Sequence, residues 1–307
     1  MTGADLTNIN FLRDYLDQNK LMPRKKFGQN FAIDNSMLEK LMTAAELHPS
    51  DTVLEIGPGI GTLTERLLSF GSDVIAVEID RGFCELLSHH FKNRPNFSLI
   101  SGDFLKPKVQ EELTARLNAI KTPVKVIANV PYYITTPIIT TLFLSGIRYS
   151  SIVLTIQKEV AQRLAAQPGG KTYGSITIFA RYYADCEIYA ELPPQSFFPS
   201  PKVFSSIIRL TPYESSPYQC KNPLFFHKIV KLCFNERRKM IKNNVQKLLK
   251  GFQCDSDAMT PDIIDKLLAD NSIKPTDRPE NIDIAQYFTL SESLWKLCPE
   301  NIKNKYA

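Results

Sequence analysis

The chain has 307 residues, of which 43% are hydrophobic and 22% charged, a balance typical of a globular protein long enough for two domains. No stretch approaches the roughly 18 consecutive apolar residues that a membrane-spanning helix needs. Acidic residues among the first twenty positions argue against a secretory or transit signal, so we expect a cytoplasmic protein with no membrane partner. The six cysteines form no C-x-x-C pair and the four histidines show no ligand spacing, which predicts free thiols and no metal site.

The formal net charge of +5 is distributed unevenly along the chain. Residues 221–251 contain nine Lys or Arg and a single acid, Glu236. That window carries +8, so the remainder of the chain sums to −3. A concentrated positive charge of this kind predicts a polyanionic partner for the C-terminal part.

From residue 52 onward, short apolar runs alternate with segments of helical spacing. The predicted strands are 53–56, 73–79, 97–101, 124–129 and 151–156, and the predicted helices are 62–69, 82–91, 107–118 and 136–145. This alternation is typical of an α/β fold with a doubly wound, Rossmann-like sheet. Two further β-rich runs, TIFARYYADCEIYAEL (177–192) and KVFSSIIRL (202–210), could close the sheet with a hairpin.

The Pro- and Ser-rich run TPYESSP (211–217) is typical of a linker. Beyond it the periodicity is wholly helical, over 224–235, 238–250, 260–269 and 281–296. We therefore predict an N-terminal leader (1–22), an α/β catalytic domain (23–215) and a smaller all-α domain (216–307).

A glycine-rich turn follows the first predicted strand, in the sequence EIGPGIG (55–61). Gly57 and Gly59 would let a ligand approach the backbone closely. A dinucleotide fingerprint requires Gly or Ala three residues after the second glycine, where this chain has Thr62. The spacing G-x-G-x-G, with Glu55 before it, fits S-adenosylmethionine better than NAD.

Two further acids end the next two predicted strands. Glu78 lies 21 residues after Gly57, where a carboxylate can accept from both ribose hydroxyls. Asp103 can accept from the adenine amine of the same cofactor, with Phe104 lining the ring pocket. Each acid alone could be a helix cap or a turn residue. Their occurrence at successive strand ends, followed by Asn129 at the fourth, favours a cofactor site.

The tetrad Asn129-Val130-Pro131-Tyr132 follows a buried strand and supplies two acceptors beside an aromatic ring. The Asn129 side chain and the Pro131 carbonyl would draw an adenine N6 amine toward tetrahedral geometry, which frees its lone pair for a methyl group. Tyr132 would stack on the flipped base, with Phe198 as the candidate for its other face. No strong base is required, because the proton becomes acidic once the N–C bond forms.

With these motifs, the chain resembles the ribosomal RNA adenine N6,N6-dimethyltransferases, the KsgA family. The resemblance runs through PRKKFGQNF, VLEIGPGIGTLT, VIAVEID, ISGDFL, VIANVPYYITTPII, TYGSITIFARYYA, LPPQSFFPSPKVFSSIIRL, CFNERRKMIKNNV and RPENI. The motifs FxPxPKV and RRKxxxNN are more specific than any nucleotide-binding glycine. The resemblance implies a Rossmann-like domain dependent on S-adenosylmethionine, joined to a helical C-terminal domain.

The same resemblance implies the roles of several residues. Asn30 and the backbone near Ala32 would hold the methionine end of the cofactor, and the pocket would be completed by Gly57, Glu78, Asp103 and Asn129. The substrate would be two adjacent adenines in the 3′-terminal hairpin of 16S rRNA, each dimethylated. Ala32 departs from the family, which usually has a larger aliphatic residue there.

A basic helix over 233–249 is predicted to face RNA phosphates. Its candidate contacts are Arg237, Arg238, Lys239 and Lys242, and further candidates outside it are Lys202, Arg24, Lys25 and Lys26. We expect the partner to be small-subunit rRNA within an immature 30S particle, and the protein to act as a monomer in small-subunit biogenesis.

Rival functions are an adenine methyltransferase acting on DNA or on large-subunit rRNA, a ribosome-assembly factor whose binding role outweighs catalysis, and an NAD-dependent oxidoreductase. Val130 and the basic helical domain favour RNA over DNA. The RPENI tail and FFPSPKV favour the small-subunit enzyme. The intact acids and Asn129 argue against a decayed catalytic site, and Thr62 argues against NAD.

Overall fold

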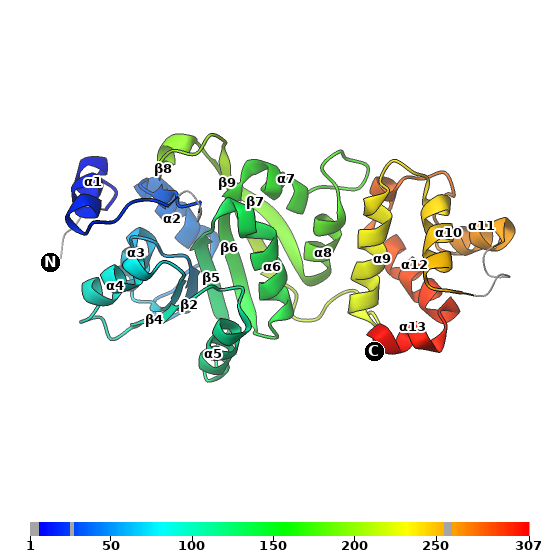
Figure 1. Cartoon of the computed structure of the whole chain (residues 1–307), viewed down its shortest axis with the longest axis horizontal. Coiled ribbons are helices and arrows are strands. Elements are labelled where there is room, and N and C mark those ends of the chain that lie inside the picture. The colour runs from blue at the N-terminus through cyan, green and yellow to red at the C-terminus, as the bar shows by residue number, and fades with distance from the viewer. Residues whose placement is uncertain (1–5, 25–27, 255–259, 307) are drawn as a thin grey trace. The chain divides into compact units, whose positions relative to one another are not determined.

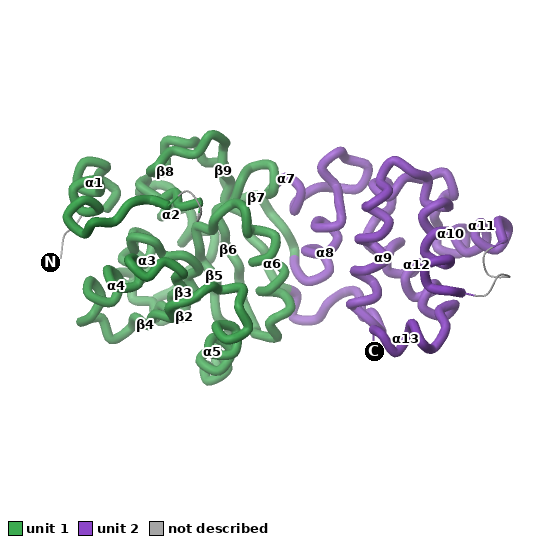
Figure 2. Tube along the Cα trace, in the orientation of Figure 1, with its two compact units in different colours: residues 1–161, 185–212 green, residues 162–184, 213–307 purple. Residues whose placement is uncertain are grey.

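The structure, a computed structural model, describes residues 6–24, 28–254 and 260–306. The chain divides into two compact units, which are residues 1–161 with 185–212 and residues 162–184 with 213–307 (Figure 2). The segment 162–184 therefore groups with the C-terminal helices, whereas its β-rich composition had placed it in the predicted catalytic domain. Among the described residues, no helix is both long and apolar enough to cross a membrane.

Strands and helices alternate through the first unit, as Figure 1 shows. The strands are β1 (Phe31–Ala32), β2 (Thr52–Ile56), β3 (Asp73–Glu78), β4 (Phe97–Ser101), β5 (Val124–Asn129), β6 (Tyr149–Gln157), β7 (Ala184–Leu192), β8 (Phe197–Phe198) and β9 (Ser205–Pro212). The helices are α1 (Ile9–Gln18), α2 (Asn35–Ala44), α3 (Thr62–Phe70), α4 (Arg81–His90), α5 (Pro107–Asn118), α6 (Thr135–Leu144) and α7 (Lys158–Leu164). The five strands and four helices predicted between residues 53 and 156 are confirmed, with ends within two residues.

The main sheet has seven strands in the order β4-β3-β2-β5-β6-β9-β7. Strands β2 to β6 are parallel where they pair, and β9 runs antiparallel to β6. The chain order reverses between β2 and β5, which lie side by side. In an open α/β sheet, ligands bind at the carboxyl ends of the strands beside such a reversal. This position is therefore where a site is expected.

Helices cover the sheet because successive residues of each strand point to opposite faces and both sets are apolar. Val53, Ile127 and Val153 pack with residues of α2, α3 and α4 in one cluster. Their neighbours Leu54 and Val126 point to the other face and are also fully buried. A sheet buried on both faces fixes the strand ends rigidly.

The predicted leader contains a helix that packs on the first unit. Asn8 caps α1 by accepting from the amides of Asn10 and Phe11. Leu12 and Leu16 are buried in a cluster with Phe31, Phe83 and their neighbours. The leader is thus part of the folded unit.

The second unit is helical in its described residues. It contains α8 (Ser175–Tyr183), α9 (Pro223–Asn235), α10 (Ile241–Gly251), α11 (Pro261–Asp270), α12 (Ile284–Leu297) and α13 (Glu300–Tyr306). The β-rich run predicted over 177–192 is wrong for residues 177–183, which form part of α8, and right for residues 184–192, which form β7. β-Branched and aromatic residues favour strands only weakly, and here Ile178 and Tyr182 are buried in the core that α9 and α12 share.

The basic stretch 233–249 is not one helix, whereas the separate helices predicted over 224–235 and 238–250 are confirmed as α9 and α10, the second beginning three residues later than predicted. Helix α9 ends at Asn235 and α10 begins at Ile241. The backbone amides of Ile241 and Lys242 donate to the carbonyls of Asp277 and Pro275. These partners replace the carbonyls of a preceding helical turn, so the chain turns at 236–240.

Candidate functional site

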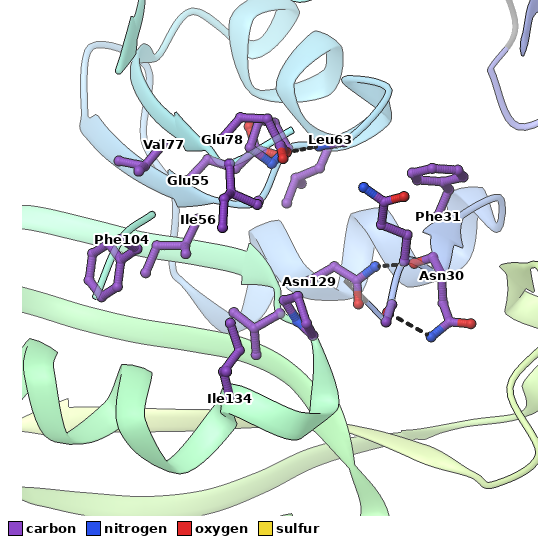
Figure 3. A pocket seen from close by; sticks show the side chains of 18 of the residues that line it. Asn30, Phe31, Glu55, Ile56, Leu63, Val77, Glu78, Phe104, Asn129 and Ile134 are labelled. Atoms are coloured by element: carbon purple, nitrogen blue, oxygen red, sulfur yellow. Dashed lines mark hydrogen bonds between the residues drawn. The ribbon is translucent and has the colours of Figure 1, made fainter. Parts of the chain in front are cut away.

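A cavity opens at the carboxyl ends of β2, β3, β4 and β5 (Figure 3). Its walls combine acidic and amide side chains at strand ends with apolar side chains. The lining includes Asn30, Ala32, Glu55, Ile56, Gly57, Gly59, Val77, Glu78, Asp103, Phe104, Asn129, Val130, Pro131, Tyr132 and Ile134. The structure therefore brings together every predicted cofactor-binding residue, together with three of the four predicted catalytic residues.

The glycine turn between β2 and α3 needs glycine for conformational reasons. Gly57 and Gly59 have φ of 70° and 58°, in the left-handed region that other residues avoid. A Cβ on Gly59 would lie 2.9 Å from the Phe31 ring, whereas a Cβ on Gly57 would meet only Pro131, at 3.9 Å. The turn therefore leaves open space above Gly57, where a ligand can approach the backbone.

Glu78 ends β3 and is 3% exposed. Its two carboxylate oxygens accept from the amides of Gly59, at 3.0 Å, and Asp80, at 2.8 Å. Burial raises the pKa of Glu78, and these amide donors oppose that increase. The carboxylate is thus fixed against the glycine turn, with lone pairs remaining for a hydroxyl.

Asp103 and Phe104 follow β4. One oxygen of Asp103 accepts from the Leu105 amide at 3.0 Å, as in a turn. Its carboxylate also borders the cavity, and the buried Phe104 ring forms the apolar wall beside it. Asp103 can therefore act both as a turn residue and as a ligand-binding residue, because a carboxylate can accept several hydrogen bonds.

Glu55 lies in β2 and is 2% exposed. It accepts a 2.6 Å hydrogen bond from the Thr64 hydroxyl in α3. Burial raises the pKa of Glu55 to about 8; the Thr64 hydrogen bond opposes this increase, and the negative charge of Glu78 adds to it. Glu55 is therefore a neutral acid at neutral pH, which joins the strand to the helix.

Asn129 ends β5, and its side-chain Nδ2 donates to the Asn30 carbonyl at 2.7 Å (Figure 3). This bond fixes the orientation of the amide. Among the described residues, no group donates to its Oδ1, so that oxygen can accept from a ligand amine. Asn30 itself donates to the Gly28 carbonyl at 3.1 Å. The strand end and the segment 28–32 thus form one hydrogen-bonded system.

The Pro131 carbonyl takes part in the turn that follows it. It accepts from the Ile134 amide at 3.2 Å, while the nearby Thr135 hydroxyl lies 3.5 Å from it and 3.2 Å from the Tyr132 carbonyl. By contrast, within the described part of the chain, no hydrogen bond reaches the Val130 carbonyl. The prediction that Pro131 supplies the second free acceptor therefore does not fit the turn geometry, although its ring lines the cavity.

Tyr132 is held by a residue that the sequence motifs did not indicate. Its hydroxyl and the Ser205 hydroxyl of β9 lie 2.5 Å apart. Burial raises the pKa of Tyr132, and the bond to Ser205 opposes it. No local pattern marks Ser205, because the contact depends on β9 pairing with β6.

Phe198 lies in β8, which pairs antiparallel with β1. The register places Phe198 opposite Phe31 and Phe197 opposite Ala32. Ala32 is 5% exposed and lines the cavity, so its small side chain forms part of the cavity wall. Phe198 is half-buried beside the cavity wall but is not among the residues that line the cavity.

The predicted RNA-binding residues of the first unit lie in different surroundings. Arg24 forms an ion pair with the buried Asp80, at 3.4 Å. Lys202 is exposed on the loop between β8 and β9. Lys25 and Lys26 lie outside the described residues.

In the second unit, two of the four predicted cations are already paired. Arg237 lies 3.5 Å from Glu280 and also donates to the Gly170 carbonyl, while Lys242 lies 2.6 Å from Asp265. Arg238 and Lys239 are exposed on the turn between α9 and α10. Neither of these two forms an ion pair with another described residue.

Residues 21–291 match the family model described as ribosomal RNA adenine dimethylase. The chain belongs to the ribosomal RNA adenine dimethylase family. It is 40% identical over 280 residues to the ribosomal RNA small subunit methyltransferase A of Picosynechococcus, covering 89% of this chain and 98% of that protein. The namesake of Lactococcus lactis is 38% identical, with 95% and 97% covered.

Two solved structures share the fold of this chain. A dimethyladenosine transferase from Plasmodium falciparum has a TM-score of 0.70 and 26% identity, with 86% of this chain and 96% of that chain covered. The 23S rRNA methyltransferase ErmE has a TM-score of 0.64 and 23% identity, with 86% and 99% covered, and shares the fold. The chain is an rRNA adenine dimethyltransferase that uses S-adenosylmethionine, and the rival functions are not favoured.

Proposed function

We propose that this dimethylase modifies N6 of two adjacent adenines in the 3′-terminal hairpin of 16S rRNA. The proposal extends to an immature 30S particle as the substrate, and to a monomer that acts in the cytoplasm without a metal. The names of the relatives, which specify the small subunit, support the first part. The orientation of the Asn129 amide supports the proposed reaction at the adenine N6 amine.

Asn129 is the residue that holds the target amine. Because its Nδ2 is committed to the Asn30 carbonyl, its Oδ1 is the atom that accepts from the adenine N6. The second acceptor is the Val130 carbonyl, since that of Pro131 already accepts from the Ile134 amide in the turn. Two acceptors off the ring plane draw the amine toward tetrahedral geometry and expose its lone pair.

Aromatic side chains hold the flipped base. Tyr132 presents its ring with the hydroxyl restrained by Ser205, and Phe198 supplies the second face. Stacking on an aromatic ring contributes roughly 1–3 kcal/mol per base. Extruding a base costs a few kcal/mol, so two such contacts offset most of that cost.

The residues lining the cavity fit the cofactor. Gly57 leaves space for close approach, Glu78 and Asp103 accept from hydroxyl and amine groups, and Phe104 supplies an apolar wall. We assign the methionine end to Asn30 and the backbone at Ala32. When bound, S-adenosylmethionine supplies a methyl group on a positively charged sulfur.

Free cations of the helical unit bind the RNA backbone. Arg238 and Lys239 are exposed and unpaired among the described residues, whereas Arg237 and Lys242 support the fold through their ion pairs. With about five phosphates neutralised, log K falls against log salt with a slope of about −3.5 to −4.5. Replacing Arg238 by Ala reduces the slope by about 0.7–0.9, while Arg237→Ala chiefly lowers the stability of the unit.

The test is methyl transfer from labelled S-adenosylmethionine to immature small subunits, mature small subunits, large subunits, free rRNA and duplex DNA, with mapping of the modified base. We expect two adjacent dimethyladenines in the small-subunit rRNA. Transfer only to large-subunit rRNA or DNA would refute the substrate assignment.

A variant tests the role of Asn129. Asn129→Ala should lower kcat by about 10²–10³-fold, as removal of one preorganised polar contact does elsewhere, with a smaller loss of cofactor affinity. Equal losses in both would make Asn129 a cofactor-binding residue only.

A further inference from the structure

Helix α1 lies against the strand pair that carries Phe198. Leu12 and Leu16 are at most 3% exposed, and they pack in a cluster that includes Phe31 of β1. Phe198 of β8 packs against the same cluster. The apolar face of α1 thus fixes the position of its polar face relative to β8.

That polar face places one cation on Phe198. The guanidinium carbon of Arg13 lies 5.4 Å from the centroid of the Phe198 ring. This distance is within the range of a cation–π contact. Arg13 is exposed and forms no ion pair with any described residue, including Asp17 one turn later on the same helix.

A second cation–π pair, on the loop that follows β8, differs because its cation also has an ion-pair partner. The Lys158 ammonium lies 5.9 Å from the centroid of the Phe204 ring. However, Lys158 also lies 2.8 Å from Glu191, with which it forms an ion pair. Of the cations in these two cation–π pairs, Arg13 is therefore the one without an ion-pair partner among the described residues.

We propose that Arg13 is a positioning residue for the RNA substrate, which supports one face of the Phe198 ring and binds a phosphate next to the target adenosine. The inference rests on the proposed function, in which Phe198 stacks on the flipped base. A guanidinium suits both tasks, since its plane stacks on a ring while its edge donates two parallel hydrogen bonds to a phosphate. With the base on the other face, the ring lies between adenine and guanidinium.

The experiment compares Arg13→Ala, Arg13→Lys and the matched control Lys158→Ala in the full chain. It measures kcat and KM for immature small subunits, RNA affinity between low and moderate salt, and cofactor affinity by calorimetry. Arg13→Ala should raise KM about 3- to 10-fold and reduce the slope of log K against log salt by about 0.7–0.9, the contribution of one phosphate contact.

Two further comparisons separate positioning from folding. Arg13→Lys should restore the salt slope, because it retains the charge, but not the full kcat, because an ammonium does not stack as a plane. Lys158→Ala should leave the slope unchanged, and all three variants should bind the cofactor as the unmodified protein does. A merely structural role of Arg13 would not change the salt slope.

An unchanged slope and KM in Arg13→Ala would overturn the proposal, as would an equal change in Lys158→Ala. Failure of the proposed function can be told apart from failure of this inference, because in that case the unmodified protein itself does not methylate small-subunit rRNA. The binding measurements decide the role of Arg13 in that case too, because they do not depend on methyl transfer.

Discussion

Replacing Glu55 by Gln should change how the stability of the first unit depends on pH. Glu55 has a pKa of about 8 in the folded protein against an ordinary value of 4.5, because burial disfavours its charge. Below pH 4.5 the group is protonated whether the chain is folded or not. As pH rises from 4.5 to 8 only the unfolded chain releases the proton, so the folded state loses stability. Above pH 8 both states are ionised and the loss is complete.

The magnitude follows from that difference in pKa. Each unit corresponds to about 1.4 kcal/mol, so the interval from 4.5 to 8 amounts to about 5 kcal/mol as an upper value. Glutamine does not titrate, and its carbonyl can still accept from the Thr64 hydroxyl. Glu55→Gln should therefore equal the unmodified protein in stability below about pH 4 and exceed it progressively, by up to about 4 kcal/mol, at pH 8.

The assay is urea unfolding at half-unit steps from pH 4 to pH 8, monitored by circular dichroism. The single tryptophan, Trp295, lies in the helical unit, so its fluorescence follows that unit separately and should not differ between the two proteins. Glu85→Gln removes an exposed carboxyl from the same unit and serves as the control. Parallel stability curves for Glu55→Gln and the unmodified protein would refute a neutral Glu55.

Three further substitutions test the site and its support. Gly59→Ala should weaken cofactor affinity measured by calorimetry, because it adds roughly 1–2 kcal/mol of backbone strain and a contact 2.9 Å from Phe31; Gly146→Ala, with φ of 73° and open space around it, controls for the strain alone. Leu16→Ala should cost about 2–5 kcal/mol locally and accelerate hydrogen exchange in α1, and unchanged exchange would mean that the helix does not depend on this contact. Tyr132→Phe should retain most activity since the ring remains, whereas Tyr132→Ala should lower kcat/KM by about 5- to 150-fold, the equivalent of 1–3 kcal/mol of stacking; similar losses in both would assign the effect to the Ser205 bond instead.

The local sequence pattern was sufficient to predict the five parallel strands at the core of the sheet. The strands that contain Val53 and Ile127 are short, apolar and buried on both faces, and glycines mark the turn at the cofactor site. Glu78, Asp103 and Asn129 could be placed in one cavity because the carboxyl ends of parallel strands meet at one edge. The alternation of strands with helices also predicted that these strands run parallel.

The errors arose where contacts between distant segments determine the local structure. Residues 177–183 are β-branched and aromatic, yet they form a helix because Ile178 and Tyr182 pack in a helical core. The start of α10 at Ile241, three residues later than predicted, depends on the carbonyls of Pro275 and Asp277, about 35 residues away in sequence. Tertiary context of this kind overrides propensity and is invisible in a single window.

The partners of charged residues could not be predicted for the same reason. A basic run indicates the total charge but not which cations are neutralised within the fold. Arg24 and Arg237 pair with Asp80 and Glu280, and the second of these acids lies 43 positions away. Arg238 is exposed on the turn between α9 and α10, so its charge remains available to bind a phosphate. Identification of the free cations therefore required the structure.

The segment 28–34 joins the two halves of the site through hydrogen bonds. On one side the Asn30 carbonyl accepts from Asn129, which holds the target amine in the proposed mechanism. On the other, the Ile33 amide donates to the Ser196 carbonyl and the Ser196 hydroxyl donates to Asp34, beside β8. A shift of this segment must therefore move the cofactor wall and the Phe198 strand together. For this reason, substitutions at Ser196 should change KM for RNA and the affinity for cofactor in the same direction, although Ser196 belongs to neither binding surface.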